Sequence, residues 1–193
     1  MIEKKMTPKL FILILAITSE LFSFAQSDID TAAIKKRLEL ILDRDQKTRV
    51  RGDSISYTNF IDSTNLIEIE SMISKYGWPG ESFVGAKGNN TVFLVIQHSD
   101  LKTQEKYLPL LEQSVKNHES RASDLALLRD RILMRQNKKQ IYGSQIIRDE
   151  ATGGWKFYSI EDEKNVNIRR KEMGLGPIEE YAKHFGIVYK LSQ

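Results

Sequence analysis

Apolar side chains that recur every three or four residues are the feature that most restricts the fold of this 193-residue chain. Such spacing places the side chains on one face of a helix, and that face has to be buried against another element. A helix commonly ends at a glycine, and a proline beyond that glycine prevents it from resuming, as in Gly77–Pro79. Four segments with this spacing are predicted to be helices: residues 30–50, 64–76, 103–117 and 120–135. Two shorter helices are predicted at 163–174 and 177–185.

The remaining segments predict one β-hairpin and several loops. Residues 140–148 and 155–160 are rich in strand-forming side chains and flank the glycine-containing turn DEATGG. Residues 51–60 and 82–90 are expected to be loops, and the spacing in 91–100 fits either a strand or a short buried helix. The predicted fold class is mainly α with one β-hairpin (α+β), formed by a single compact helical domain over residues 26–193.

The first 25 residues have the pattern of a secretory signal peptide. Three lysines precede the apolar run Leu10–Ile17, and Ser23 and Ala25 lie at the small-residue positions before a cleavage point. An uncleaved membrane anchor is the less favoured alternative, because the run is shorter than the roughly 20 residues needed to cross a bilayer and Glu20 prevents its extension. We expect an exported bacterial protein, periplasmic or secreted, that starts at Gln26 and has no stable membrane span.

The composition excludes several kinds of site. The chain has no cysteine, which excludes disulfides, thiolate metal sites and a lipid-modified N-terminal cysteine. Loss of residues 1–25 removes three of 29 basic residues and two of 26 acidic ones, leaving 26 against 24. This balance gives no indication of a nucleic-acid or anionic-membrane partner. The sequence has no glycine-rich phosphate loop, GxSxG or HExxH motif, so no cofactor is expected, and the oligomeric state is left open.

The segment FLVIQHSD, residues 93–100, carries polar side chains in apolar rows. A side chain shares its face with residue i−4 on a helix and i−2 on a strand, so Gln97 and His98 each continue an apolar row in either structure. His98 is either a core histidine bonded to a backbone carbonyl, or a general acid or base. Asp100 either caps the next helix or fixes the tautomer of His98. A metal site is less favoured, because His-x-Asp is not a strong ligand spacing.

The first predicted helix shows a similar pattern. Its apolar stripe through Ile34, Leu38 and Ile41 continues at Asp45 and Arg49. These two residues either form a solvated ion pair at i,i+4 near the helix end, or line a cleft in which Arg49 anchors an anion and Asp45 orients it.

The C-terminal third leaves two further alternatives open. In QIYGSQ, Tyr142 and Gln145 lie on opposite faces of a predicted strand, either as part of an ordinary amphipathic hairpin or beside a close backbone approach at Gly143. Arg169 and Arg170 belong either to a solvated basic face or to an anion clamp. The remaining histidines, His118 and His184, are expected to face solvent.

Several segments resemble a bacterial family of unknown function, recognised by the signatures DQxxR, GWPG, QHxD, YGxQ and VNxRR in this order. The segments are YGWPG, FLVIQHSD, KYLPLLEQSV, LRDRIL, QIYGSQ and NVNIRRKEMGLGPIEEY, and the resemblance covers roughly residues 35–184. The chain departs from the family at Ser99, Ser144 and His118, where Ala, Thr and Gly are usual. The resemblance implies that 91–100 is helical, and it brings no established reaction. It groups the polar residues into one shared pocket: Asp45, Gln46, Arg49, Gln97, His98, Asp100, Tyr142, Gln145, Arg169 and Arg170.

The first functional hypothesis is an exported enzyme, a hydrolase or transferase of small polar or anionic substrates. His98 would be the acid or base with Asp100 beside it, Gln97 and Gln145 would position the substrate, and the arginines would hold an anionic group. One alternative is a non-catalytic domain that binds a small ligand in the same pocket. Another is a buried polar network that only specifies the fold.

Overall fold

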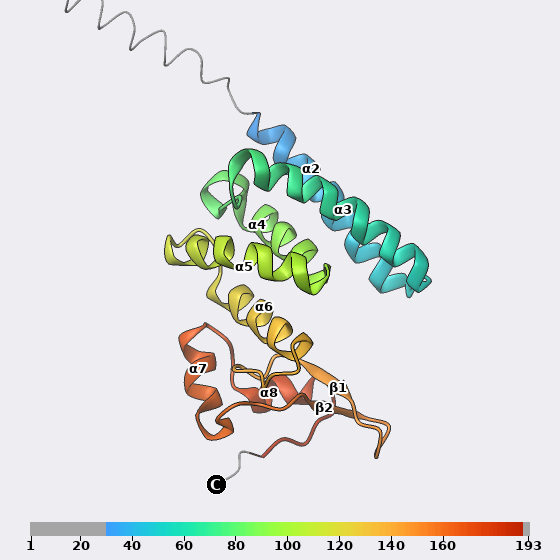
Figure 1. The fold of residues 1–193 in the computed structure, drawn as a ribbon, viewed down its shortest axis with the longest axis vertical. Coiled ribbons are helices and arrows are strands. Elements are labelled where there is room, and N and C mark those ends of the chain that lie inside the picture. The colour runs from blue at the N-terminus through green and yellow to red at the C-terminus, as the bar shows by residue number, and fades with distance from the viewer. Residues whose placement is uncertain (1–29, 191–193) are drawn as a thin grey trace, which may run out of the picture. The chain divides into compact units, whose positions relative to one another are not determined.

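The computed structural model describes residues 30–190, drawn in colour in Figure 1. The predicted signal peptide, residues 1–25, and the predicted domain start at residue 26 lie outside the described residues. No helix within the described range is long and apolar enough to cross a membrane. The chain divides into two compact units between Ala33 and Ile34, and the hydrophobic core lies in the second unit. The elements in chain order are α2 (Thr31–Arg51), α3 (Ile55–Tyr76), α4 (Glu81–His98), α5 (Leu101–Lys116), α6 (Ala122–Arg135), β1 (Ile146–Arg148), β2 (Trp155–Phe157), the 3-10 helix η1 (Glu163–Asn165), α7 (Val166–Glu172) and α8 (Ile178–Lys183).

The predicted class, mainly α with one hairpin, is confirmed, because helices dominate the described residues and the strands form one antiparallel pair. The segment 91–100 is helical to His98, as the resemblance implied. A hydrophobic core forms where α2 to α6 meet, and its fully buried members include Leu38, Ile69, Ile96 and Leu128.

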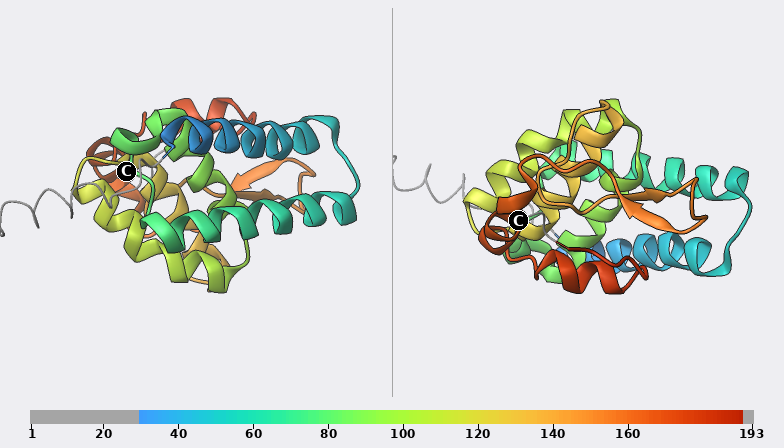
Figure 2. Two further views of the ribbon diagram at one scale, coloured as in Figure 1. Left: turned by 90° about the horizontal axis from the view of Figure 1, so that it is seen from above. Right: turned by 90° about the horizontal axis from the view of Figure 1, so that it is seen from below.

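The helices α2 and α3 form two long arms joined at one end by a short turn (Figure 2). Side chains bridge the arms. Arg37 and Arg44 of α2 both donate to the carboxylate of Glu68 on α3, with Arg44 Nη2 2.7 Å from Glu68 Oε1. These contacts tie α2 to α3 along their length.

The prediction of a loop over 51–60 was wrong, because α3 begins at Ile55. Its N-cap is Ser54, whose Oγ accepts a hydrogen bond from Tyr57 N at 3.3 Å. The apolar stripe did not reveal this first turn, since Ile55 and Phe60 point outward and are 81% and 64% exposed. The early start places Asp62 inside a helix rather than at its cap.

The prediction of a loop over 82–90 was also wrong, because α4 covers this segment with a kink at Gly85, where φ is 77°. The glycine and asparagine residues here have tertiary roles that outweigh their low helix propensity. A Cβ on Gly88 would lie 3.1 Å from Leu38 Cδ1. Asn89 is buried and donates 2.8 Å hydrogen bonds to Pro79 O and Ser120 Oγ.

The hairpin is shorter than predicted. Ile146 pairs with Phe157 and Arg148 with Trp155, whereas residues 140–145 form a loop that meets the second half of the hairpin through a bridge between Gln140 and Ile160 and a hydrogen bond from Tyr158 N to Gln145 O. The sequence-based assignment of strand faces in QIYGSQ was therefore wrong. The reason is that buried side chains from other elements, Asp130 above all, bind the backbone groups of this loop.

Candidate functional site

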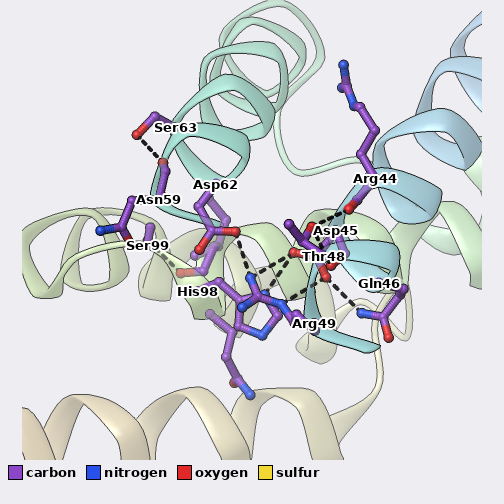
Figure 3. A network of polar contacts seen from close by, with 12 residues as sticks. Arg44, Asp45, Gln46, Thr48, Arg49, Asn59, Asp62, Ser63, His98 and Ser99 are labelled. Atoms are coloured by element: carbon purple, nitrogen blue, oxygen red, sulfur yellow. Dashed lines mark hydrogen bonds and ion pairs between the residues drawn. The ribbon is translucent and has the colours of Figure 1, made fainter. Parts of the chain in front are cut away.

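The centre of the candidate site is the carboxylate of Asp45. This residue lies on the buried stripe of α2 with Leu38, Ile41 and Thr48, and it is 1% exposed. A buried carboxylate needs hydrogen-bond donors around it, because an isolated buried charge is costly. Figure 3 shows side chains from α2, α3 and α4 gathered around this position.

Three side chains donate to Asp45. Its Oδ1 lies 3.0 Å from His98 Nδ1 and 3.0 Å from Arg49 Nη2. Its Oδ2 accepts from Gln46 Nε2 at 2.7 Å and from Arg49 Nε at 3.3 Å. Arg49 Nη2 also donates to Asp62 Oδ1 at 2.7 Å, so one guanidinium bridges the carboxylates of α2 and α3. The predicted Asp45–Arg49 pair therefore exists, and it is part of a larger network instead of a solvated pair at a helix end.

These contacts set the ionisation of the two carboxylates. Burial on its own would raise the pKa of Asp45, but the hydrogen bonds from His98 and Arg49 outweigh it and lower the pKa to about 2. For Asp62, burial outweighs the attraction of Arg49 and raises the pKa above its usual value. Asp45 is therefore the ionised anchor of the network at neutral pH.

The imidazole of His98 is held in one orientation. His98 is the last residue of α4, and 17% of its side chain is exposed. An ionised carboxylate only accepts hydrogen bonds, so the hydrogen of the neutral imidazole lies on Nδ1, facing Asp45, and Nε2 carries the basic lone pair. Among the described residues Nε2 has no hydrogen-bond partner.

A cavity of about 210 Å³ adjoins this imidazole. Two hydroxyl groups line this cavity, and both already donate hydrogen bonds to backbone carbonyls. Ser63 Oγ donates to Asn59 O at 2.8 Å, and Ser99 Oγ donates to Ile96 O at 2.6 Å. The wall is mostly polar, with two carboxylates and one amide: it consists of Asn59, Asp62, Ser63, Leu66, His98, Ser99 and Asp100.

The same residues offer part of a metal donor set. Ligand atoms of Asp45, Asp62 and His98 lie within 4.8 Å of one another. However, Arg49 already donates to both oxygens of Asp45 and to Oδ1 of Asp62, and its positive charge takes the place that a cation would occupy. A metal ion would have to displace this guanidinium, so the arrangement fits an ion-pair network better than a metal centre.

Asp100 has the capping role that was one of its two alternatives. Its Oδ1 accepts from Thr103 N at 2.7 Å at the start of α5, and this hydrogen bond lowers the pKa of Asp100. Asp45, rather than Asp100, is the carboxylate that contacts His98. Asp100 still lines the cavity, where it contributes a negative charge.

Gln97 is buried next to His98, as its place in an apolar row predicted. Its side chain is 6% exposed, and in the described chain Oε1 has no hydrogen-bond partner. The backbone carbonyl of Gln97 accepts a hydrogen bond from Gln104 Nε2 at 2.7 Å, which ties the end of α4 to α5.

The other four predicted site residues, Tyr142, Gln145, Arg169 and Arg170, belong to a separate set of contacts around the loop 140–145. The centre of this set is Asp130, which is fully buried and accepts from the backbone N–H groups of Ile141, Tyr142 and Ser144 at 2.7, 3.0 and 2.9 Å. Arg169 Nε donates to Ile141 O at 2.9 Å, and Arg170 Nη1 donates to Tyr142 O at 2.8 Å. These guanidinium groups satisfy carbonyl groups of the chain itself.

The side chains of Tyr142 and Gln145 also have local partners. Gln145 Nε2 donates to Ser144 Oγ at 2.9 Å, and Tyr142 OH lies 3.5 Å from Arg129 Nη1. The ten predicted residues therefore divide between the end of α4 with the Asp45 network and this loop, and of the ten only His98 and Asp100 line the cavity. Within residues 30–190 no hydrogen bond among the ten joins the two sets.

Sequence reasoning missed Asp62, Asp130 and Arg131. Asp62 lies before the predicted helix start at residue 64, although it is four residues before Leu66 and so shares the apolar face of α3. Asp130 and Arg131 follow Ala126 and Leu127 at i+4 on α6, so the face comparison that identified His98 would have identified them too.

Comparisons with known proteins agree with the resemblance. A family model described as "Family of unknown function (DUF6624)" matches residues 30–192. No curated protein and no solved structure matches the chain.

Proposed function

Because the chain belongs to DUF6624, a family of unknown function, we propose a function from the site itself: the cavity beside His98 binds a small polar molecule and hydrolyses it. The single observation that carries the proposal is the 3.0 Å contact between His98 Nδ1 and the ionised carboxylate of Asp45, next to a polar cavity. A buried carboxylate that holds an imidazole in this way leaves Nε2 as a general base.

Water is the nucleophile that fits this arrangement. The hydroxyls of Ser63 and Ser99 already donate to backbone carbonyls of their own helices, so neither is presented to His98. In the proposed reaction, Nε2 takes a proton from water as its oxygen attacks an electrophilic carbon of the substrate. Asp45 stabilises the resulting imidazolium, which then returns the proton to the leaving group.

The cavity wall favours a neutral or cationic polar substrate over a strongly anionic one. Asp62 and Asp100 both line it, while Arg49 is engaged by Asp45 and Asp62. Asn59 and the acidic side chains supply acceptors for hydroxyl, amide or ammonium groups of a ligand. Small esters and amides with hydroxyl or amino substituents are therefore the compounds to test first.

Non-catalytic binding of the same kind of ligand is the second candidate function. It is favoured by the composition of the wall, because the hydroxyls of Ser63 and Ser99 already donate to backbone carbonyls and the carboxylates of Asp62 and Asp100 would not stabilise a developing oxyanion. A saturable ligand-induced rise in stability without turnover would support this alternative.

The test is a hydrolysis screen of the purified protein and its His98→Gln variant. We expect turnover of at least one small polar ester or amide, and a decrease of about 10²- to 10⁴-fold in the variant. His184→Gln is the matched control, because that imidazole is exposed at the end of α8 and should not affect the rate. Turnover that survives in His98→Gln would refute the mechanism.

The urea denaturation midpoint of His98→Gln tests whether His98 has a purely structural role. If His98 only completes a folding network, its loss leaves Asp45 short of a donor and lowers the free energy of unfolding by about 1–3 kcal/mol. A stable variant that has lost turnover supports the hydrolytic role instead.

Export is part of the proposal and is supported by the signal-peptide pattern of residues 1–25. Cell fractionation followed by N-terminal sequencing tests it. We expect the mature protein in the periplasm or the medium with Gln26 as its first residue. Recovery of the intact N-terminus from the cytoplasm would contradict export.

A further inference from the structure

The helix α6 carries three arginines and has a fourth, Arg121, as its N-cap, and one of the four differs from the others. Arg121 pairs with Asp124, Arg129 Nη2 donates to Glu112 Oε1 at 2.8 Å, and Arg135 Nη1 donates to Ser99 O at 2.5 Å. Arg131 forms no ion pair or hydrogen bond with any residue in 30–190, and its Nε is buried without a partner. A partly buried guanidinium with all of its donors unused is unusual, since buried charges are normally paired.

The groups nearest to Arg131 do not neutralise it. Burial lowers the pKa of Arg131, and the positive charges of Arg135 and Arg49 lower it further. Among the described residues, Tyr181 is the nearby group that acts in the opposite direction, and burial raises the pKa of its phenol, so it is uncharged at neutral pH. The charged groups that act on Arg131 are therefore the positive ones of Arg135 and Arg49.

The nearby arginines cannot take the role of Arg131, because their donors are engaged. Arg49 binds Asp45 and Asp62, and Arg170 binds the carbonyls of Tyr142 and Gly176. Arg135 lies one turn after Arg131 on the same face of α6. It uses Nη1 for Ser99 O, and its Nε and Nη2 have no partner within the described chain. Two guanidinium groups with unused donors are thus adjacent on one helix.

We propose that Arg131 and Arg135 form a binding site for a small oxyanion, a carboxylate or a phosphoryl group. Planar, bidentate donation from guanidinium groups matches both kinds of oxyanion. The wall of the cavity beside His98 includes neither Arg131 nor Arg135, although Arg135 donates to the carbonyl of the wall residue Ser99, and the proposed site does not depend on the proposed hydrolysis. In this proposal Arg131 and Arg135 hold the anion, which is the role that the first functional hypothesis gave to Arg49, Arg169 and Arg170.

The experiment measures the thermal midpoint of the purified full chain in inorganic phosphate, in acetate and in chloride at equal ionic strength. We expect a saturable rise of a few degrees in phosphate, in acetate or in both, relative to chloride. A response to phosphate alone assigns the site to phosphoryl groups, and a response to acetate assigns it to carboxylates. An identical midpoint in all three salts would overturn the proposal.

Arg131→Met is the diagnostic variant, because methionine keeps the apolar stem and removes the unpaired charge. In chloride its midpoint should equal or exceed that of the parent, and its response to the oxyanion should be lost. Arg129→Met is the matched control: it removes the same charge from the same helix at a guanidinium already paired with Glu112, and it should keep the response. An equal response in Arg131→Met and the parent would refute the assignment.

A second measurement does not depend on how the variant folds. In a protein labelled with ¹⁵N-arginine, the Arg131 Nε–H signal, assigned through Arg131→Lys, should shift during a phosphate or acetate titration. A signal that stays fixed in both titrations would exclude the site. His98→Gln should keep the shift, so loss of hydrolysis and loss of anion binding are separately observable.

Discussion

Asp45 and His98 are separated by 53 positions in the sequence, yet Oδ1 of the carboxylate lies 3.0 Å from Nδ1 of the imidazole. Asp45 comes from the buried stripe of α2 and His98 from the last position of α4. Their contact, together with Arg49, makes Asp45 a strongly ionised group inside the protein. The stability of the protein should therefore depend on Asp45 and on its charge.

Asp45→Asn should destabilise the protein. The substitution keeps the size of the side chain but removes the charge that Arg49 and His98 require, and removal of one partner from a buried ion pair typically costs about 3–5 kcal/mol. Urea denaturation measures the loss. The matched control is Asp43→Asn, which removes an exposed carboxylate paired with Lys47 on the same helix and should change stability by less than about 0.5 kcal/mol. Equal effects of the two substitutions would contradict the assignment of Asp45 as a buried anchor.

The stabilising effect of Asp45 should disappear in acid. Its pKa is about 2 in the folded protein, below the reference value of 3.8, so the folded state favours the ionised form. This contribution is complete above about pH 5 and is lost as the pH falls towards 2, by about 2 kcal/mol from the size of the shift. The difference in unfolding free energy between the parent and Asp45→Asn should narrow over this window. A difference that stays constant from about pH 6 to pH 2 would show that Asp45 titrates normally.

Asp130→Ala should release the loop 140–145. The carboxylate accepts from three backbone N–H groups of this loop, and the substitution leaves them buried without an acceptor. We expect a loss of about 2–4 kcal/mol in stability and faster amide hydrogen exchange at Ile141, Tyr142 and Ser144. Glu150→Gln, at an exposed position in the hairpin turn, is the control and should leave exchange at these amides unchanged. Unchanged protection in Asp130→Ala would mean that other contacts hold the loop.

Alanine substitutions at two glycines with similar backbone angles distinguish the cost of backbone strain from the cost of steric overlap. Gly143 and Gly153 have φ of 65° and 70°, so an alanine is strained at either position by about 1 kcal/mol. A Cβ at Gly143 would also lie 2.5 Å from Ile178 Cδ1, whereas nothing lies within 4 Å of one at Gly153. Gly143→Ala should therefore cost about 1–3 kcal/mol more than Gly153→Ala in urea denaturation. Equal costs would show that Ile178 moves aside freely.

The helical elements could be predicted where their apolar faces are regular. The stripe through Leu38 and Ile41 predicted α2, and the stops at Gly77 and Gly174 fall at the ends of helices in the structure. Prediction failed where tertiary contacts outweigh local preference. Gly88 and Asn89 locally favour a loop, but in α4 the glycine admits Leu38 and the asparagine is satisfied by Pro79 O and Ser120 Oγ.

For the candidate site, the face comparison identified individual residues but not their groups. It found that Asp45, Gln97 and His98 continue apolar rows, and the structure places Asp45 and Gln97 in the interior and His98 at the edge of a cavity. It did not separate Arg49, which contacts Asp45, from Arg169 and Arg170, which hold a loop by its carbonyls. Which polar side chains contact one another depends on how the helices pack, and this packing cannot be inferred from the positions of polar residues in one sequence.

The order of residues is sufficient to predict the class of fold, the boundaries of several helices and the presence of polar side chains on faces that have to be buried. These properties result from local spacing and backbone preference, which each segment carries in its own residues. The packing of the helices in space was needed to reveal that Asp45, rather than Asp100, orients His98, and that Arg131 has no partner in the described chain. The physical reason is that hydrogen bonds and charge pairing act over a few ångströms in space, between residues whose separation along the chain carries no such information.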